Sequence, residues 1–275
     1  MIRSLCAVAL SLALLATAPA PKTKLDPVPR NAQTEIVTKY LQAMQAANYA
    51  DAYALLNAQA RAYYRNAVNF RSIYDADGYR ITSFALVGTR AATALGRVYY
   101  AREHATFRDH AHDVNGSVTA NVPVGVVVEN NGLRIKDPGH PWRAFAPNAA
   151  AANGGLKAIV KKISFFDRRI EAIVTFVNTG ADFVTLLPYG KSVLRDDKGG
   201  VYRIIETKDW ALTDLTLFQG LRLAPNAMYT GVLMFESPHL DDAVRSFELV
   251  LGPSLREGAD APFELDIANL QPPHA

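Results

Sequence analysis

Residues 118–128 of the chain read Val-Thr-Ala-Asn-Val-Pro-Val-Gly-Val-Val-Val. Apolar side chains occupy every second position from Val118 to Val128, which is the period of a strand with one buried face. Asn131-Gly132 follows, and both residues tolerate the positive φ angles of a type I′ turn. This stretch therefore predicts a long strand and a hairpin, and with them an antiparallel sheet in the first half of the chain.

Helical patterns precede this strand. Apolar residues recur at helical spacing from Ile36 to Met44, and Asn31 or Thr34 is expected to cap that helix. Asn48 and Asn57 are expected to cap two further helices, because an asparagine side chain can accept hydrogen bonds from the exposed amides of a first helical turn.

The pattern changes after Gly78. Residues 81–87 and 97–108 are rich in β-branched and aromatic side chains, so we expect two strands there. A last strand is expected at residues 142–145. Helices followed by a meandering antiparallel sheet indicate an α+β domain.

The second half of the chain is strand-like throughout. About seven short strands, separated by turn signals such as Asn178-Thr179-Gly180, predict an all-β sandwich. The expected strands cover residues 156–166, 169–178, 201–206, 217–223, 228–235, 247–251 and 263–267.

The chain has 275 residues, which favours two domains. Residues 1–20 contain Arg3, a short apolar run and Ala18-Pro19-Ala20, and we read them as an export signal. An uncleaved membrane anchor is the alternative, since Pro21 would directly follow the cut. The expected order is the signal, a Pro-rich tether at 21–30, a first domain at 31–146, an Ala/Gly linker at 147–155 and a second domain at 156–270.

Composition excludes several classes of function. The formal net charge is only +3, which argues against a nucleic-acid-binding surface. Cys6 is the one cysteine, so a disulfide framework within the chain and a thiolate-rich metal site are excluded. The sequence contains no glycine-rich phosphate loop and no Gly-x-Ser-x-Gly motif.

Two family resemblances add to this interpretation. Tyr40-Leu41-Gln42-Ala43-Met44, the segment from Asn48 to Leu56, and Trp142-Arg143 resemble the nuclear-transport-factor-2-like, or cystatin-like, cone fold. The second half is similar to an extracellular immunoglobulin-like domain of unknown function found in bacterial lipoproteins and surface proteins. The residues that carry this second resemblance are 174–180, 197–200, Pro225 and 231–238.

These resemblances imply a fold and leave the reaction open. The expected fold class is an α+β cone, with helices packed on a curved antiparallel sheet, followed by an all-β immunoglobulin-like sandwich. Both folds host unrelated functions, so neither resemblance implies a fixed activity.

Four residues are the candidate ligand-binding residues of the cone. We expect Tyr53, Tyr64, Tyr99 and His104 to line its pocket. If the domain were an enzyme, His104 or Glu103 would act as the base that removes a proton next to a carbonyl, while a tyrosine hydroxyl stabilised the oxyanion.

A metal site is a further hypothesis. If the chain stays extended, His110 and His112 share a face and could hold Zn²⁺ together with Asp113. The alternative, which we favour, is a solvated hairpin end with Asn115-Gly116 as its turn, because this spacing matches no fixed zinc motif.

The sequence as a whole predicts an exported protein that is periplasmic, surface-associated or secreted. We expect a non-catalytic binding or interaction protein without a cofactor. Its partner would be an envelope or extracellular protein or a small apolar ligand, and the sheet of the cone could form a homodimer. The alternative function is a small-molecule enzyme of the isomerase or lyase type. Contact with a membrane is expected only if the N-terminal segment stays uncleaved.

Overall fold

The structure is a computed structural model that describes residues 25–92, 96–137, 140–187, 191–209, 220–237 and 244–271. It consists mostly of antiparallel strands with few helices. The chain divides into two units, one formed by residues 1–109 and 113–143 and the other by residues 144–275 together with 110–112. The predicted export signal and residues 21–24 of the predicted tether lie outside the described residues.

Each described helix of unit 1 follows a capping asparagine. The side chains of Asn31, Asn48, Asn57 and Asn66 each accept a hydrogen bond from the backbone N–H three residues further on. Such caps stabilise short helices by satisfying amides that have no partner within the helix. The helices are α2 (Ala32–Gln45), α3 (Tyr49–Ala54), α4 (Ala58–Tyr64) and α5 (Ala67–Ala76).

A four-stranded antiparallel sheet completes unit 1, with its strands in sequence order. Its strands are β1 (Arg80–Ala92), β2 (Gly96–Asp109), β3 (Val114–Glu129) and β4 (Gly132–Lys136). The β3–β4 hairpin forms, but its turn lies one residue earlier than predicted. Asn130 and Asn131 have φ angles of 49° and 61°, and Glu129 pairs with Gly132.

The turn between β2 and β3 also differs from the expectation. Residues 110–113 form the turn, whereas Asn115 and Gly116 lie inside β3. Gly116 pairs with Phe107, and a Cβ atom at Gly116 would come within 2.8 Å of the Phe107 ring. The glycine therefore makes room for an aromatic ring and does not make a turn.

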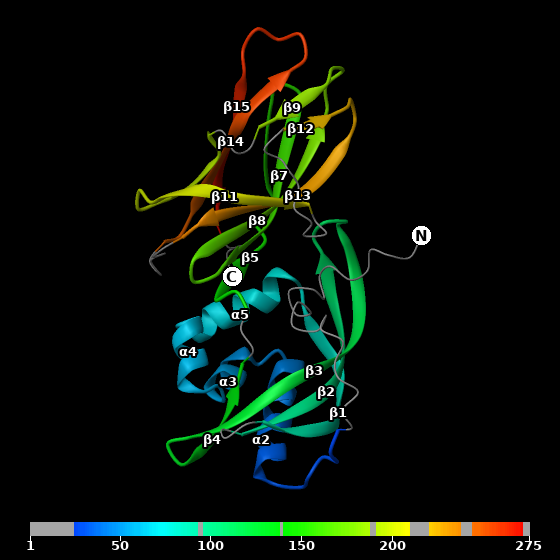
Figure 1. Cartoon of the computed structure of the whole chain (residues 1–275), viewed down its shortest axis with the longest axis vertical. Coiled ribbons are helices and arrows are strands. Elements are labelled where there is room, and N and C mark those ends of the chain that lie inside the picture. The colour runs from blue at the N-terminus through cyan, green and yellow to red at the C-terminus, as the bar shows by residue number, and fades with distance from the viewer. Residues whose placement is uncertain are drawn as a thin grey trace. The chain divides into compact units, whose positions relative to one another are not determined.

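The helices of unit 1 gather on one side of its sheet (Figure 1). Phe70 of α5 is fully buried, and its ring lies 5.0 Å from that of Tyr64, 5.2 Å from Tyr74 and 6.0 Å from Tyr53, measured between centroids. Tyr49 meets the same ring edge-on at 6.4 Å. Phe70 is thus the centre at which α3, α4 and α5 pack together.

The described part of unit 2 consists mainly of strands, and the strand pairs formed between residues 149 and 270 are antiparallel. The strands are β5 (Arg143–Phe145), β6 (Ala149–Asn153), β7 (Leu156–Phe165), β8 (Arg169–Asn178), β9 (Val184–Leu186), β10 (Val193–Asp196), β11 (Val201–Asp209), β12 (Leu221–Leu223), β13 (Met228–Glu236), β14 (Phe247–Arg256) and β15 (Phe263–Leu270).

The strand order in this sheet is β12-β9-β14-β10-β11-β13-β8-β7-β5, with β15 paired to β14 and β6 paired to β7. Phe165 of β7 and Phe247 of β14 come from distant strands of this order, yet their rings lie 5.2 Å apart. The sheet therefore folds back on itself around a buried aromatic core.

Two segments differ from the sequence-based expectation. The strand expected at residues 142–145 to close the first domain is β5, which pairs with β7 in the second sheet. The predicted linker at residues 147–155 contains β6, which forms a hairpin with β7. Gly154 and Gly155 connect these strands with φ angles of 56° and 80°, which glycine adopts without strain. The alanine run is therefore an ordered strand.

No helix in the described part of the chain is both long and apolar enough to cross a membrane.

Phe70→Ala is expected to destabilise unit 1 by about 3–5 kcal/mol, because it removes a fully buried ring and leaves a cavity. Val68→Ala is the matched control on the same helix, since Val68 is 75% exposed and its loss should change stability by less than about 0.5 kcal/mol. Urea unfolding followed by NMR signals of unit 1 measures both values. Equal destabilisation by the two variants would contradict the central role of Phe70.

Candidate ligand pocket in unit 1

Unit 1 contains a partly open cavity of about 40 Å³ between its helices and its sheet. Apolar side chains from α2, β1, β3 and β4 form part of its lining. The polar lining groups belong to α2, α5, β2 and β4, or follow α5 or β4 in the chain. They are Tyr40, Tyr74, Tyr79, Glu103, Lys136, Asp137 and His140.

Strand periodicity places Glu103 in the interior. Tyr99, Ala101, Glu103, Ala105 and Phe107 alternate along β2, and all five are buried. The residues between them face the opposite side of the sheet and are mostly exposed. The side chain of Glu103 thus enters the cavity from the same face that packs against the helices.

The carboxyl group of Glu103 is a much weaker acid than that of an exposed glutamate. The residue is only 5% exposed, and this burial raises the pKa of its carboxyl to about 7, because a buried charge loses hydration. Tyr79 donates a hydrogen bond from its hydroxyl to Glu103 Oε2 at 3.1 Å, which partly opposes the rise in pKa. Near neutral pH the carboxyl therefore exchanges a proton readily.

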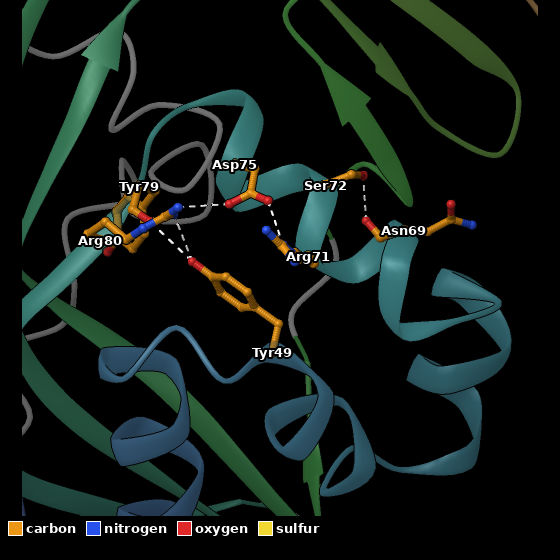
Figure 2. Close-up of polar contacts among 7 residues, drawn as sticks. All are labelled: Tyr49, Asn69, Arg71, Ser72, Asp75, Tyr79 and Arg80. Carbon is orange, nitrogen blue, oxygen red and sulfur yellow. Dashed lines mark hydrogen bonds and ion pairs between the residues drawn. The ribbon is translucent and has the colours of Figure 1, made fainter. Parts of the chain in front are cut away.

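An ionic network holds the backbone at Tyr79 (Figure 2). Arg80 donates hydrogen bonds to the carbonyl oxygen of Tyr79 at 2.8 Å, to the hydroxyl of Tyr49 at 2.9 Å and to Asp75 Oδ1 at 2.8 Å. Asp75 also pairs with Arg71 at 2.7 Å. These contacts join α3, α5 and the start of β1, and so position the tyrosine that bonds Glu103.

A second carboxylate lines the cavity just after β4. Tyr64 donates a hydrogen bond from its hydroxyl to Asp137 Oδ1 at 2.6 Å. Burial and the nearby charge of Asp137 raise the pKa of Tyr64 well above its ordinary value, so this hydroxyl keeps its proton. His140 Nε2 lies 4.0 Å from the same Asp137 oxygen.

Tyr40 and Tyr74 are buried and stay neutral. Burial is the main cause that raises the pKa of each, and the charge of Asp137 contributes to both. The ring centroid of Tyr74 lies 6.1 Å from that of Tyr79. The cavity is thus lined by neutral phenols next to two carboxyl groups.

The structure brings one of the four predicted ligand residues next to this lining. Tyr64 contacts Asp137, as described above. The hydroxyl of Tyr53 donates to the carbonyl oxygen of Arg61 at 3.0 Å, outside the cavity. Tyr99 is buried, but its hydroxyl lies 3.3 Å from Thr34 Oγ1 at the start of α2.

His104 lies on the other face of the sheet. It is exposed, and its Nδ1 lies 2.8 Å from Thr119 Oγ1 on β3. Of the two bases considered for an enzyme, the structure therefore places Glu103 in the cavity and His104 outside it.

The extended arrangement on which the metal hypothesis depends does not form. His110, His112 and Asp113 lie in the turn between β2 and β3, where His110 is buried and His112 is exposed. Asp113 forms an ion pair with Arg108 at 2.5 Å. Among the described residues, no group of three or more His, Cys, Asp or Glu side chains is arranged to hold a metal ion.

Sequence reasoning did not find most of this lining. The sequence contains a signal for two of these residues. Tyr40 lies on the apolar face of its helix, and Asp137 follows the buried Ile135 by two residues at the end of a strand, so both could have been predicted to face the interior. No pattern in the sequence indicates that Tyr79 or His140 approaches these groups, since neither lies in a regular element.

No protein-family model and no curated protein matches the chain. The solved structures that resemble part of it include two proteins of Bacillus species. The yjhA protein from Bacillus subtilis is 20% identical over 38% of this chain and 77% of its own, with a TM-score of 0.27. A conserved hypothetical protein from Bacillus anthracis is 12% identical over 44% of this chain and 95% of its own, with a TM-score of 0.30. Because both TM-scores are below 0.5, neither likeness bears on the function.

The stability of unit 1 should fall as the pH rises from 4.5 to about 7. The carboxyl of Glu103 has a pKa of about 7 when folded against an ordinary value of 4.5, so its contribution is fully present below 4.5 and is lost as the pH rises through 7. This difference corresponds to about 3 kcal/mol. Urea unfolding of the wild type and of Glu103→Gln across this range measures it. Parallel pH curves for the two proteins would contradict the prediction.

Tyr79→Phe should raise the pKa of Glu103 further, because it removes the hydrogen bond that favours the ionised carboxyl. The carboxyl carbon signal of Glu103, followed by NMR over pH, reports this pKa directly. Tyr100→Phe is the control, since Tyr100 lies on the opposite face of β2. An unchanged or lowered pKa in Tyr79→Phe would show that the hydroxyl does not stabilise the ionised form.

Proposed function

We propose that the protein is a non-catalytic binding protein and that the cavity of unit 1 is its ligand site. One observation carries this proposal: Glu103, Tyr79 and Asp137 line the same partly open cavity, together with the side chains of Tyr40 and Tyr74. A buried carboxyl group is costly unless a partner compensates it, so its presence in a cavity favours a ligand that supplies one.

The size of the cavity restricts its ligand. Pockets that hold whole small molecules usually measure about 300–1,000 Å³, whereas this cavity measures about 40 Å³. Contacts among the rings of Tyr49, Phe70 and Tyr74 fill the space between the helices. A small group, or one end of a larger molecule, can enter this site.

We assign unit 1 to the cystatin-like cone and unit 2 to the immunoglobulin-like sandwich. The first assignment is supported by helices on one side of a four-stranded antiparallel sheet. The second is supported by the contact between Phe165 and Phe247, which brings two parts of the sheet face to face. In this proposal unit 2 offers its loops and strand edges to an envelope or extracellular protein.

Export is part of the proposal and rests on the sequence. Arg3, the apolar run after it and Ala18-Pro19-Ala20 form the pattern of an export signal. The protein would accordingly work in the periplasm, at the cell surface or outside the cell.

An enzyme of the isomerase or lyase type is the second candidate function. The observation that favours it is the pKa of about 7 at Glu103, next to the hydroxyl of Tyr79. Such a carboxylate could remove a proton next to a carbonyl group while the hydroxyl stabilised the oxyanion.

Binding without turnover is the expected result for small probe molecules. The probes are methylammonium, methanol, acetate and acetone, each added to the full chain in D₂O and followed by NMR. At least one probe should shift the signals of Tyr79, Glu103 and Asp137 saturably, because the cavity admits groups of a few heavy atoms. Acetone should gain deuterium no faster than it does in buffer.

Two outcomes would overturn the proposal. If no probe shifts these signals, the cavity is not a ligand site. If the protein deuterates acetone and Glu103→Gln abolishes that exchange, the enzyme replaces the binding protein as the function of unit 1.

A further inference from the structure

The cavity has the chemistry of a cation site. Glu103 and Asp137 supply two carboxyl groups, and the rings of Tyr40, Tyr74 and Tyr79 surround them. Two basic residues are among the described lining residues, His140 and the exposed Lys136. A carboxylate attracts a positive charge, and aromatic faces attract it as well, whereas both repel an anion.

One carboxylate oxygen is available to such a ligand. Within the described part of the chain, Glu103 accepts a single side-chain hydrogen bond, at Oε2 from Tyr79. Its Oε1 has no hydrogen-bond donor among the described residues, and Glu103, which lines the cavity, is only 5% exposed. An N–H group with a positive charge would satisfy both the hydrogen-bonding capacity and the charge of this oxygen.

The size of the cavity limits what can enter. About 40 Å³ is room for roughly three water molecules. A group of one or two heavy atoms fits, and a carbon on that group can contact the apolar side chains of Leu41, Met44 and Ile135 that complete the lining.

We propose that the cavity binds the ammonium head group of a small primary amine between Glu103 and the tyrosine rings. This inference rests on the proposed function, because it names the ligand class of the same site. In this proposal the neutral phenols of the lining supply polar and aromatic contacts to the cation, and the carboxylate of Glu103 supplies its counter-charge.

The pH dependence of binding follows from the groups that face Glu103. Tyr40, Tyr74 and Tyr79 keep their protons, because burial raises their pKa values. Asp137, His140 and Lys136 are the other titratable groups of the lining. If binding requires ionised Glu103, the affinity for an amine should rise about tenfold between pH 6 and pH 8.

Competition between small probes of different charge tests the inference. Methylammonium chloride, methanol, sodium acetate and potassium chloride are titrated into the full chain at pH 8 and constant ionic strength, with NMR detection at Glu103 and Tyr79. We expect methylammonium to bind at least tenfold more tightly than each of the others. Glu103→Gln should remove that preference, and Glu35→Gln, which deletes an exposed charge on α2, should preserve it.

A second variant assigns the pH dependence. His140→Gln should retain the tenfold rise between pH 6 and pH 8, and Glu103→Gln should lose it. Retention in Glu103→Gln, or loss in His140→Gln, would overturn the assignment to Glu103.

The outcomes separate this inference from the proposed function. If methanol, acetate or potassium binds as tightly as methylammonium, the amine inference is wrong, whereas the cavity remains a ligand site. If none of the four probes shifts the signals of Glu103 and Tyr79, and acetone does not either, both proposals fail.

Discussion

The unbroken pairing of β2 with β3 decides which side chains enter the interior of unit 1. All 14 residues of β2 pair with β3 without a register shift, although β1 pairs with β2 through two shifts. A slip of one residue would bring His104 inside and turn Glu103 toward solvent, since neighbouring residues of a strand face opposite sides. The polar character of the cavity therefore depends on a register that the long ladder of hydrogen bonds maintains.

Helix packing and site chemistry are linked in this unit. Phe70 holds α3, α4 and α5 together, and Tyr64 and Tyr74 belong both to that aromatic cluster and to the surroundings of the cavity. The burial that stabilises the helices also removes water from around Glu103, and this raises the pKa of its carboxyl. A change in the aromatic core should consequently alter the acidity of the site as well as the stability of the fold.

The sequence predicts most helices and strands correctly, but it predicts few of the pairs that the strands form. Caps at Asn48 and Asn57 and the alternation from Val118 to Val128 are local signals, and the corresponding helices and strand are present. The pairing of residues 143–145 with β7 is not local, and the alanines of β6 have the composition of a linker. The predictions for these two segments were therefore wrong.

The site was predictable in part. The alternation of Tyr99, Ala101, Ala105 and Phe107 indicates that Glu103 faces the interior of unit 1. The approach of Tyr79 and Asp137 depends on tertiary packing, which no local pattern encodes.

The position of β14 in the sheet affects the order in which the two units can fold during synthesis. This strand pairs with β9, β10 and β15, so it connects segments from Val184 to Leu270. A chain that emerges from its N-terminus can complete the sheet of unit 1 once Lys136 is available, whereas unit 2 lacks this strand until Arg256 has been made. Until then, the strands of unit 2 that pair with β14 have unpaired edges. Unit 2 is therefore most prone to aggregation and to cleavage by proteases during this interval.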